Sequence, residues 1–444
     1  MTTRWPRPTF PIREAHAHLA SLGQSLGMRS LEACPTLAEC LEIVRQECAA
    51  ARAAGPHAFI RLTSARPQGW PEQRWPTRLE LDAASADAAG GPPVPVVILS
   101  FDYHSAAANT AALAAANLRA GVPVPPKGTV CETAPDSGEA SGVLLEDAAK
   151  AAWNAAPEPS PAERRGYVAR ACRHLAALGF VEVHDLLSQD WLGPVLADLD
   201  RAGELPVAVR LYPLVDHVKR VHAGRAAWET SRVRLAGGKV FADGTLNSRT
   251  AFLLHRYAEP LLDWPRGHCM VAPALLEEHL RLVDRLGLHL AVHAIGDGAV
   301  RTVLDAIEKV APANSRTGPH RIEHGEIIDA TDVPRFARLG VACSVQPCHL
   351  LTDVEALHRF VPHRLTRVLP LRELIDSGCR PGELLWFGSD VPIVRADPED
   401  SLQAAVERRR PGTPEADMIA PKQRITAEEA WACFAAREPA TSSI

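Results

Sequence analysis

The chain of 444 residues lacks several features that would place it in a large class of proteins. It contains no run of eighteen apolar residues, so we expect no membrane-spanning helix. Its 48 Lys and Arg residues are outnumbered by 53 Asp and Glu residues, which gives a net charge of −5. This charge balance argues against the basic surface that nucleic-acid binding requires.

The first eight residues also lack the apolar stretch and small-residue cleavage site of a secretion signal. The ten cysteines are scattered and include no Cys-x-x-Cys pair. We therefore expect a cytoplasmic protein whose thiols are reduced and mostly buried. These exclusions leave a small-molecule substrate as the expected partner, with no nucleic acid and no membrane, and they leave a homo-oligomer open.

The sequence does have a globular composition, with 46% hydrophobic and 23% charged residues. Strand-like segments alternate with helical stretches such as residues 274–286 and 300–310. The eight strand-like segments are residues 12–16, 180–184, 207–212, 234–241, 288–293, 321–324, 341–345 and 384–390. This alternation predicts an α/β fold, a (β/α)8 TIM barrel that occupies residues 1–444 as one domain. A doubly wound parallel sheet is the alternative.

One long interval does not fit a single strand–helix unit. We predict that residues 31–161 form a large insertion between the first two barrel strands, covering part of the barrel mouth. Its middle is rich in Pro, Gly and Ala, and residues 94–102 are expected to add an extra strand. The Ala-rich residues 105–118 are expected to form a helix that serves packing rather than chemistry.

Five of the predicted strands end in residues that can bind a metal. The candidates are His16, His18, Lys239, His293, His324 and Asp390. His16 and His18 point to the same face because side chains alternate along a strand. The carboxyl ends of barrel strands converge at one mouth, so we expect all six side chains to meet there.

Each candidate also has an ordinary structural explanation when it is taken alone. A lysine at a strand end is usually a surface residue, and a buried histidine such as His324 usually bonds a carbonyl. Asp390 can equally cap the turn that follows it. The joint placement at the ends of different strands, in this chain order, is what favours a metal site.

The order of these residues resembles the amidohydrolase superfamily of metal-dependent barrels, and most closely amidohydrolase family 3, the branch of YtcJ-like proteins and N-substituted formamide deformylase. The segments that carry the resemblance extend over nearly the whole chain. They are residues 16–18, 102–105 with Asn109, 142–144 with Glu146, 239–250, 293–297, 321–324, 345–349 and 387–392. Family members usually carry a small accessory β-sandwich. Because fifteen residues precede His16 and a helix-like segment ends near residue 436, we expect this chain to lack it.

The resemblance implies a role for each candidate. His16 and His18 would bind one metal, His293 and His324 a second, and Lys239, carbamylated by carbon dioxide, would bridge the two. Asp390 would touch the first metal and the bridging hydroxide, and would move a proton to the leaving nitrogen. Zn²⁺ is the expected ion, with one or two per chain, because imidazole and carboxylate suit it. A mononuclear site with unmodified Lys239 is the alternative.

Five further residues are candidates for catalysis or substrate binding. We expect His104, in the insertion, to polarise a carbonyl. Asp243 and Arg249 follow Lys239 on the same loop, where they can bind substrate or simply pair with each other. Gln346 and His349 follow the seventh strand and are expected to line the pocket.

The sequence therefore predicts a metal-dependent hydrolase that cleaves a non-peptide carbon–nitrogen bond (an amide, formamide or cyclic amide) with a metal-activated hydroxide. One alternative is an ester, lactone or phosphotriester hydrolase on the same centre. Another is a non-catalytic metal-binding barrel, although all six positions retain side chains that can bind a metal. A third is a sugar or phosphate barrel that needs no metal.

Overall fold

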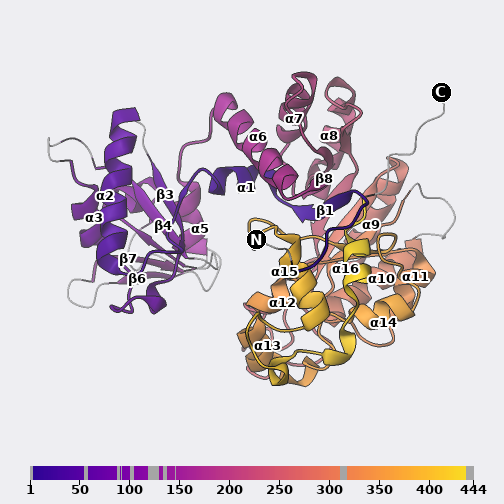
Figure 1. Cartoon of the computed structure of the whole chain (residues 1–444). Helices are drawn as coiled ribbons and strands as arrows, with labels where there is room; N and C mark the ends of the chain where they lie inside the picture. The colour runs from indigo at the N-terminus through magenta and orange to yellow at the C-terminus, as the bar shows by residue number, and fades with distance from the viewer. Residues whose placement is uncertain are drawn as a thin grey trace. The chain divides into compact units, whose positions relative to one another are not determined.

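The computed structural model describes residues 4–54, 59–87, 91, 93–100, 105–118, 130–133, 138–145, 147–310 and 318–436. The chain forms two compact units. One consists of Met1–Gly23 and Arg164–Ile444, and the other of Gln24–Glu163. The predicted insertion, residues 31–161, falls within the second unit, and the domain boundaries stay a prediction. Figure 1 shows the elements of both units in chain order.

Two parallel sheets form the framework of the first unit. Their strand orders are β1-β8-β9-β10 and β11-β12-β13-β14-β15, and all neighbours pair in parallel. The strands are β1 (Ile12–Ala17), β8 (Phe180–Leu186), β9 (Ala208–Tyr212), β10 (Val233–Leu235), β11 (Gly237–Phe241), β12 (His289–Ala294), β13 (Arg321–His324), β14 (Ala342–Val345) and β15 (Leu385–Phe387). The predicted α/β character with parallel strands is confirmed.

The predicted strand 234–241 is wrong as a single element, because it is divided between the two sheets. β10 pairs with β9, and β11 pairs with β12. Ala236 lies between them and bonds to both sides. Its N–H donates to the carbonyl of Leu211 at 3.0 Å, and its carbonyl accepts from the N–H of His289 at 3.1 Å. The division therefore leaves the hydrogen bonding of the backbone unbroken at this point.

The first strand of one sheet also bonds to the residues that follow the last strand of the other. The N–H of Asp390 donates to the carbonyl of His16 at 2.7 Å, and the N–H of His18 donates to the carbonyl of Val391 at 2.9 Å. The segments that carry the first and last predicted metal ligands are therefore tied together through their backbones.

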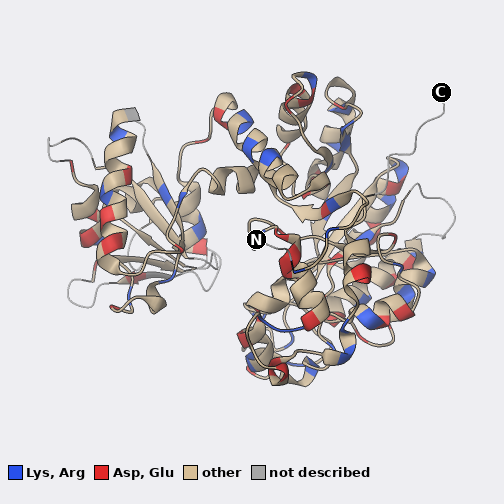
Figure 2. Ribbon diagram, viewed as in Figure 1, with Lys and Arg blue, Asp and Glu red and all other residues tan. Residues whose placement is uncertain are grey.

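Helices follow the strands of the first unit. They are α1 (Leu19–Ser25), α6 (Pro161–Ala177), α7 (Leu192–Arg201), α8 (Val215–Gly224), α9 (Pro273–Arg285), α10 (Asp297–Val310), α11 (Val333–Leu339), α12 (His349–Thr352), α13 (Val354–Phe360), α14 (Leu371–Asp376), α15 (Pro398–Leu402) and α16 (Ala427–Cys433). Figure 2 shows that charged residues of both signs lie mostly on helices and loops rather than on the strands. Within the described part of the chain, no helix is both long enough and apolar enough to cross a membrane.

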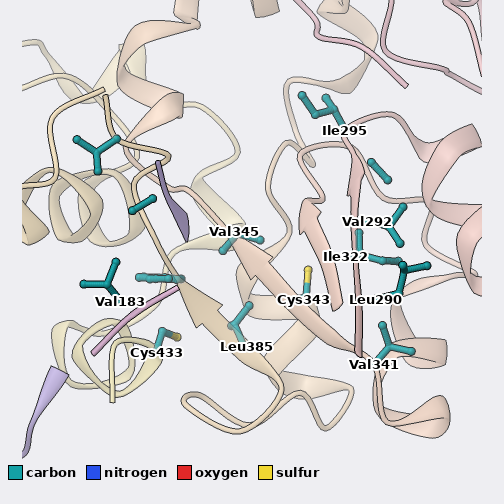
Figure 3. Packing of buried hydrophobic residues seen from close by; sticks show 14 of the residues in the cluster. Val183, Leu290, Val292, Ile295, Ile322, Val341, Cys343, Val345, Leu385 and Cys433 are labelled. Atoms are coloured by element: carbon teal, nitrogen blue, oxygen red, sulfur yellow. The ribbon is translucent and has the colours of Figure 1, made fainter. Parts of the chain in front are cut away.

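The core of the first unit follows from the alternation of side chains along its strands. On β12, Leu290 and Val292 belong to the large apolar cluster, which Figure 3 shows together with Ile322 and Cys343 of the next two strands. Those side chains face the helices, and their burial drives the sheets and helices together. The intervening positions, such as His293, point to the opposite face of the sheet.

The second unit has its own sheet, in the order β2-β3-β4-β5-β7-β6. The strands are β2 (Arg29–Ser30), β3 (Ile60–Ala65), β4 (Val96–Ser100), β5 (Ser105–Ala108), β6 (Val130–Thr133) and β7 (Ala140–Leu145), and the helices are α2 (Leu37–Ala54), α3 (Arg78–Ser85), α4 (Thr110–Ala115) and α5 (Asp147–Asn154). Helices α2 and α3 lie on one face of this sheet and α5 on the other (Figure 1).

The predicted extra strand, residues 94–102, is present as β4. The predicted helix 105–118 is wrong in its first part. Residues 105–108 form β5, which pairs antiparallel with both β4 and β7, and only the residues from Thr110 onward are helical. The small alanine side chains of this stretch permit either structure, and pairing with two neighbouring strands decides for the strand.

Candidate metal centre

The six side chains predicted to converge lie together at the carboxyl ends of their strands. They are His16 in β1, His18 directly after it, Lys239 in β11, His293 in β12, His324 at the end of β13, and Asp390 shortly after β15. Two of them have a left-handed backbone, with φ of +72° at His324 and +65° at Asp390. Such angles are uncommon for residues other than glycine. At these two residues the backbone breaks the regular alternation of side chains as the chain leaves its strand.

Asp390 joins the two histidines of the first strand. Its Oδ1 lies 3.2 Å from Nε2 of His16 and 2.8 Å from Nε2 of His18. Burial raises the pKa of Asp390, but His16 and His18 outweigh burial and hold it well below its usual value. Burial lowers the pKa of His18, and the hydrogen bond and charge of Asp390 raise it above its usual value. The carboxylate is therefore ionised at neutral pH.

His293 and His324 extend this group on the other side. Their ring centroids are 4.4 Å apart, and the ring of His324 lies 5.0 Å from that of His16. Burial and then the charge of Lys239 lower the pKa of His293 to about 3. Burial and the neighbouring His293 also hold the pKa of His324 well below its usual value. Both imidazoles are therefore neutral near pH 7, the form that binds metals.

Lys239 is buried beside these imidazoles, with a side chain that is 1% exposed. Its Nζ has no hydrogen-bond partner among the described residues and lies 5.2 Å from the ring centre of Phe241. Burial lowers the pKa of Lys239 to about 8, although the charges of Glu323 and Asp390 oppose this shift. A neutral amine is the form that can add carbon dioxide, so the predicted carbamate is chemically accessible here.

This set of donor atoms fits a divalent cation. One ligand atom from each of His16, His324 and Asp390 lies within 4.8 Å of the other two. Neutral imidazole and carboxylate are ligands that Zn²⁺ and similar ions prefer. In the part of the chain that the structure describes, Nζ of Lys239 and Nδ1 of His324 are buried without a hydrogen-bond partner. Such buried orphan atoms are expected where the partner is a ligand.

A buried carboxyl group holds Asp390 beside His16. Glu14 Oε1 accepts hydrogen bonds from the N–H groups of His16 and Ser389, both at 2.9 Å, and Oε2 accepts from Oγ of Ser389 at 2.9 Å. A Cβ atom on Gly388 would lie 2.5 Å from the N of His16, so only glycine fits there. Burial raises the pKa of Glu14 to about 7 despite these bonds.

A buried ion pair orients His16 from behind. Nδ1 of His16 lies 2.7 Å from Oε2 of Glu323, and Nη2 of Arg321 donates to the same oxygen at 3.1 Å. Arg321 Nε also bonds Oε1 of Glu323, and its Nη2 donates to Oγ of Ser344 at 2.8 Å. With Nδ1 of His16 held by a carboxylate, Nε2 faces the centre, which is the orientation that a metal-binding imidazole needs. Carboxylate–histidine pairs of this kind fix the tautomer of metal ligands.

The same arginine continues the network away from the centre. Nη1 of Arg321 donates to Nδ1 of His184 at 2.7 Å, and Nε2 of His184 donates to Oε1 of Glu182 at 3.1 Å. Burial lowers the pKa of His184 to about 4, and the charge of Arg321 adds to this shift, while Glu182 opposes it. The pKa of Glu182 falls to about 2 despite burial, because His184 and Arg210 are close.

The lowered pKa of His184 should make the stability of the protein depend on pH. Its pKa is near 6.5 in an unfolded chain and about 4 in the folded protein, so the unfolded state binds more protons between these values. The contribution of neutral His184 to the free energy of unfolding is complete above pH 6.5 and is lost as the pH falls toward 4. We expect His184→Gln, which keeps an acceptor for Arg321 and a donor for Glu182, to flatten the stability profile by about 3 kcal/mol over this range. Urea unfolding at several pH values measures it, and parallel profiles for the two proteins would contradict the prediction.

The two residues predicted on the loop after β11 have separate partners. Asp243 accepts backbone hydrogen bonds from Phe252, Ile295 and Gly296 at 2.8–3.0 Å, and its Oδ1 lies 3.7 Å from Nε2 of His293. Burial raises its pKa to about 7. Arg249 donates to the carbonyl of Glu259 at 3.2 Å and stacks on Phe360. Asp243 thus braces the segment after His293, and its role in substrate binding stays a prediction, as does that of Arg249.

Gln346 and His349 do lie beside the centre. Nε2 of Gln346 is 3.3 Å from Nδ1 of His16, and the ring of His349 is 6.0 Å from the ring of His324. His349 also shares a second group of close donor atoms with His324 and Glu326. His104, the predicted oxyanion residue, lies outside the described residues.

Four acidic or basic residues near the centre were not predicted from the sequence. Arg321 and Glu323 flank a buried isoleucine in a short strand, and Glu14 lies two positions before His16. In each case the spacing of two places the charged side chain on the same face as a functional neighbour, which is a usable signal. Glu326 follows its strand in a loop, and no spacing rule relates it to His349.

Comparison with known proteins places this geometry in a family. A model of the amidohydrolase family matches residues 12–442. Putative amidohydrolase YtcJ of Bacillus subtilis is 31% identical over 360 residues, which cover 77% of this chain and 64% of that protein. N-substituted formamide deformylase of Arthrobacter pascens is 26% identical over 441 residues, covering 94% of this chain and 76% of that protein.

A solved structure gives the same result. The crystal structure of an uncharacterized metal-dependent hydrolase from Pyrococcus horikoshii has a TM-score of 0.74 and 27% sequence identity, covering 95% of this chain and 78% of that one. The chain spans 60% and 64% of the length of two of the curated relatives that it matches. The family model extends over nearly all of the sequence, and the chain belongs to the amidohydrolase family, in the branch of amidohydrolase family 3.

Proposed function

We propose that this chain is a metal-dependent hydrolase that cleaves a non-peptide carbon–nitrogen bond in an amide, formamide or cyclic amide. The observation that carries the proposal is the meeting of four imidazoles, one buried amine and one carboxylate from distant parts of the sequence. A relative named for the deformylation of N-substituted formamides supports the choice of bond, and a structural relative described as a metal-dependent hydrolase supports the cofactor.

We also propose that the two parallel sheets of the first unit close into one barrel. The bonds of Ala236 on one side and those between Asp390 and His16 on the other support a closed (β/α)8 barrel, with β10 and β11 counted as one strand. In such a barrel, residues at the carboxyl ends of the strands share one mouth. Residues 31–161 are then an insertion after the first strand.

We assign a place to each donor. His16 and His18 would hold one metal position, His293 and His324 a second, and Lys239 would join the two as a carbamate, with Zn²⁺ as the expected ion. A bound divalent ion supplies a water of lowered pKa and polarises the carbonyl of the substrate. Glu323 would keep Nε2 of His16 available by accepting the proton on Nδ1.

Asp390 would move the proton. Its carboxylate is ionised at neutral pH and is anchored by the backbone bond to His16 and by the glycine at position 388. It can therefore accept a proton from the attacking water and deliver it to the leaving nitrogen, first as a base and then as an acid. His104 remains our candidate for polarising the carbonyl.

Metal removal tests the function. Dialysis against a chelator should abolish hydrolysis of an amide and formamide panel, and adding Zn²⁺, Mn²⁺ or Co²⁺ should restore it. Elemental analysis of the purified protein should find one or two divalent ions per chain. Esters, lactones and phosphotriesters in the same panel identify the bond that is cleaved. Unchanged activity in the chelated protein, or a preference for esters over amides, would refute the proposal.

A further inference from the structure

A small pocket beside the candidate metal centre is lined by hydrogen-bond acceptors. Its polar walls are Glu326, Gln346, His349 and Asp353, and the remaining walls are leucine and valine side chains. None of the lining residues that the structure describes is a lysine or an arginine. The pocket therefore offers carboxyl groups and lone pairs, with no Lys or Arg in the described part of its wall to pair with them.

One of these acceptors, Oε1 of Gln346, has no donor in the part of the chain that the structure describes. Gln346 is 2% exposed, its Nε2 donates to the carbonyl of Ser344 at 3.4 Å, and its buried Oε1 has no hydrogen-bond partner among the described residues. Nε2 of His349 lies 3.2 Å from the carbonyl of Ser389, so this nitrogen carries the proton and Nδ1 is the acceptor. That Nδ1 lies 3.9 Å from Oε1 of Glu326.

Buried acceptors without a donor are costly, so the missing donor is expected to come from a ligand. The free space is about 10 Å³ for the centre of a water-sized group, so the pocket admits one such group and nothing larger. We propose that this pocket binds a primary ammonium group of the substrate. The enzyme would then prefer amides that carry a positively charged amine a few bonds from the scissile carbonyl. This inference rests on the function proposed above.

The spacing of the acceptors leaves room for an ammonium group. Nδ1 of His349 and Oε1 of Glu326 are 3.9 Å apart, and one nitrogen can contact both with hydrogen bonds of about 3 Å. Asp353, whose Oδ1 already accepts from Nδ2 of Asn247 at 2.7 Å, adds a second carboxyl group to the wall.

The position of the pocket sets the length of the substrate. His324 belongs both to the group with His16 and Asp390 and to the group with Glu326 and His349, and the ligand atoms within each group lie within 4.8 Å of one another. A carbonyl at the centre and an ammonium in the pocket are thus separated by about the width of one imidazole. Short amino amides meet this condition.

Matched amides test the preference. Glycinamide and propanamide differ only by an ammonium in place of a methyl group, and so do β-alaninamide and butanamide. We compare kcat/KM within each pair, using the metal-loaded protein. For the charged amide that is hydrolysed faster, we expect kcat/KM to be at least about 100-fold higher than for its neutral partner, because a neutral group leaves the acceptors unpaired. Glu326→Gln should reduce this ratio at least about 10-fold, mainly through KM. Glu355→Gln removes an equal charge from an exposed carboxylate of α13 and should leave the ratio unchanged.

A binding measurement separates this inference from the proposed function. Titration calorimetry of the metal-loaded protein with propylammonium chloride should show binding that propanol does not show and that Glu326→Gln weakens at least about 10-fold. This result supports the pocket even if no amide is hydrolysed. Equal binding of the two probes, no binding of propylammonium, or an unchanged Glu326→Gln protein would overturn the inference. So would the loss of one metal equivalent in Glu326→Gln, which would identify a metal ligand instead.

Discussion

Replacing Arg321 with methionine is expected to lower the free energy of unfolding by about 3–5 kcal/mol, because it leaves the carboxylate of Glu323 buried without its counter-charge. Both side chains are fully buried, and the guanidinium bonds Glu323, His184 and Ser344 together. Methionine fills a similar volume without these bonds. Equilibrium unfolding in urea, monitored by tryptophan fluorescence, measures the change. Arg338→Met, which removes an exposed ion pair with Glu308, should cost less than about 1 kcal/mol.

A second substitution shows whether the unpaired charge is the cause. Glu323→Gln in the Arg321→Met background removes that charge, and it should recover part of the lost stability. If Glu323→Gln lowers the free energy of unfolding by the same amount in the Arg321→Met background as in the wild type, the two residues act independently. A loss of under about 1 kcal/mol for Arg321→Met would likewise contradict a buried ion pair of this strength.

Asp390→Asn is expected to lower kcat by a factor of about 10² to 10⁴, the range that loss of a positioned acid or base produces. Asparagine keeps the size of the side chain and an oxygen that can accept from His18, so the local fold should persist. The measurement is kcat at saturating substrate, on whichever amide of the panel is hydrolysed, together with the metal content of each protein. Retention of metal with loss of kcat assigns Asp390 to proton transfer.

The matched control is Asp376→Asn, in α14, where the exposed carboxylate pairs with Arg372. It makes the same chemical change at an exposed helix position and should leave kcat within about twofold of the wild type. An Asp390→Asn protein with unchanged kcat would remove the carboxylate from the proposed mechanism. Parallel loss of kcat and of bound metal would show instead that Asp390 acts mainly as a ligand.

The strands and the order of the candidate residues along them could be predicted from the sequence. Short apolar segments of period two and the helices between them locate the parallel strands, because that periodicity reflects which side of a sheet is buried. His16 and His18 were recognisable for the same reason, since two positions along a strand return to one face. The division of residues 234–241 was not predictable, because it depends on how Ala236 bonds to two different neighbours.

The amino-acid sequence by itself determined which chemical groups are available and on which strand each one lies. Only the tertiary structure decided which groups became partners. It set Glu323 against His16 from a strand more than three hundred positions away, and it left Oε1 of Gln346 facing a pocket with Glu326 and His349. The physical reason is that local periodicity reports the burial of each side chain, whereas hydrogen bonds and ion pairs between distant strands depend on three-dimensional packing, which spacing along a chain does not contain.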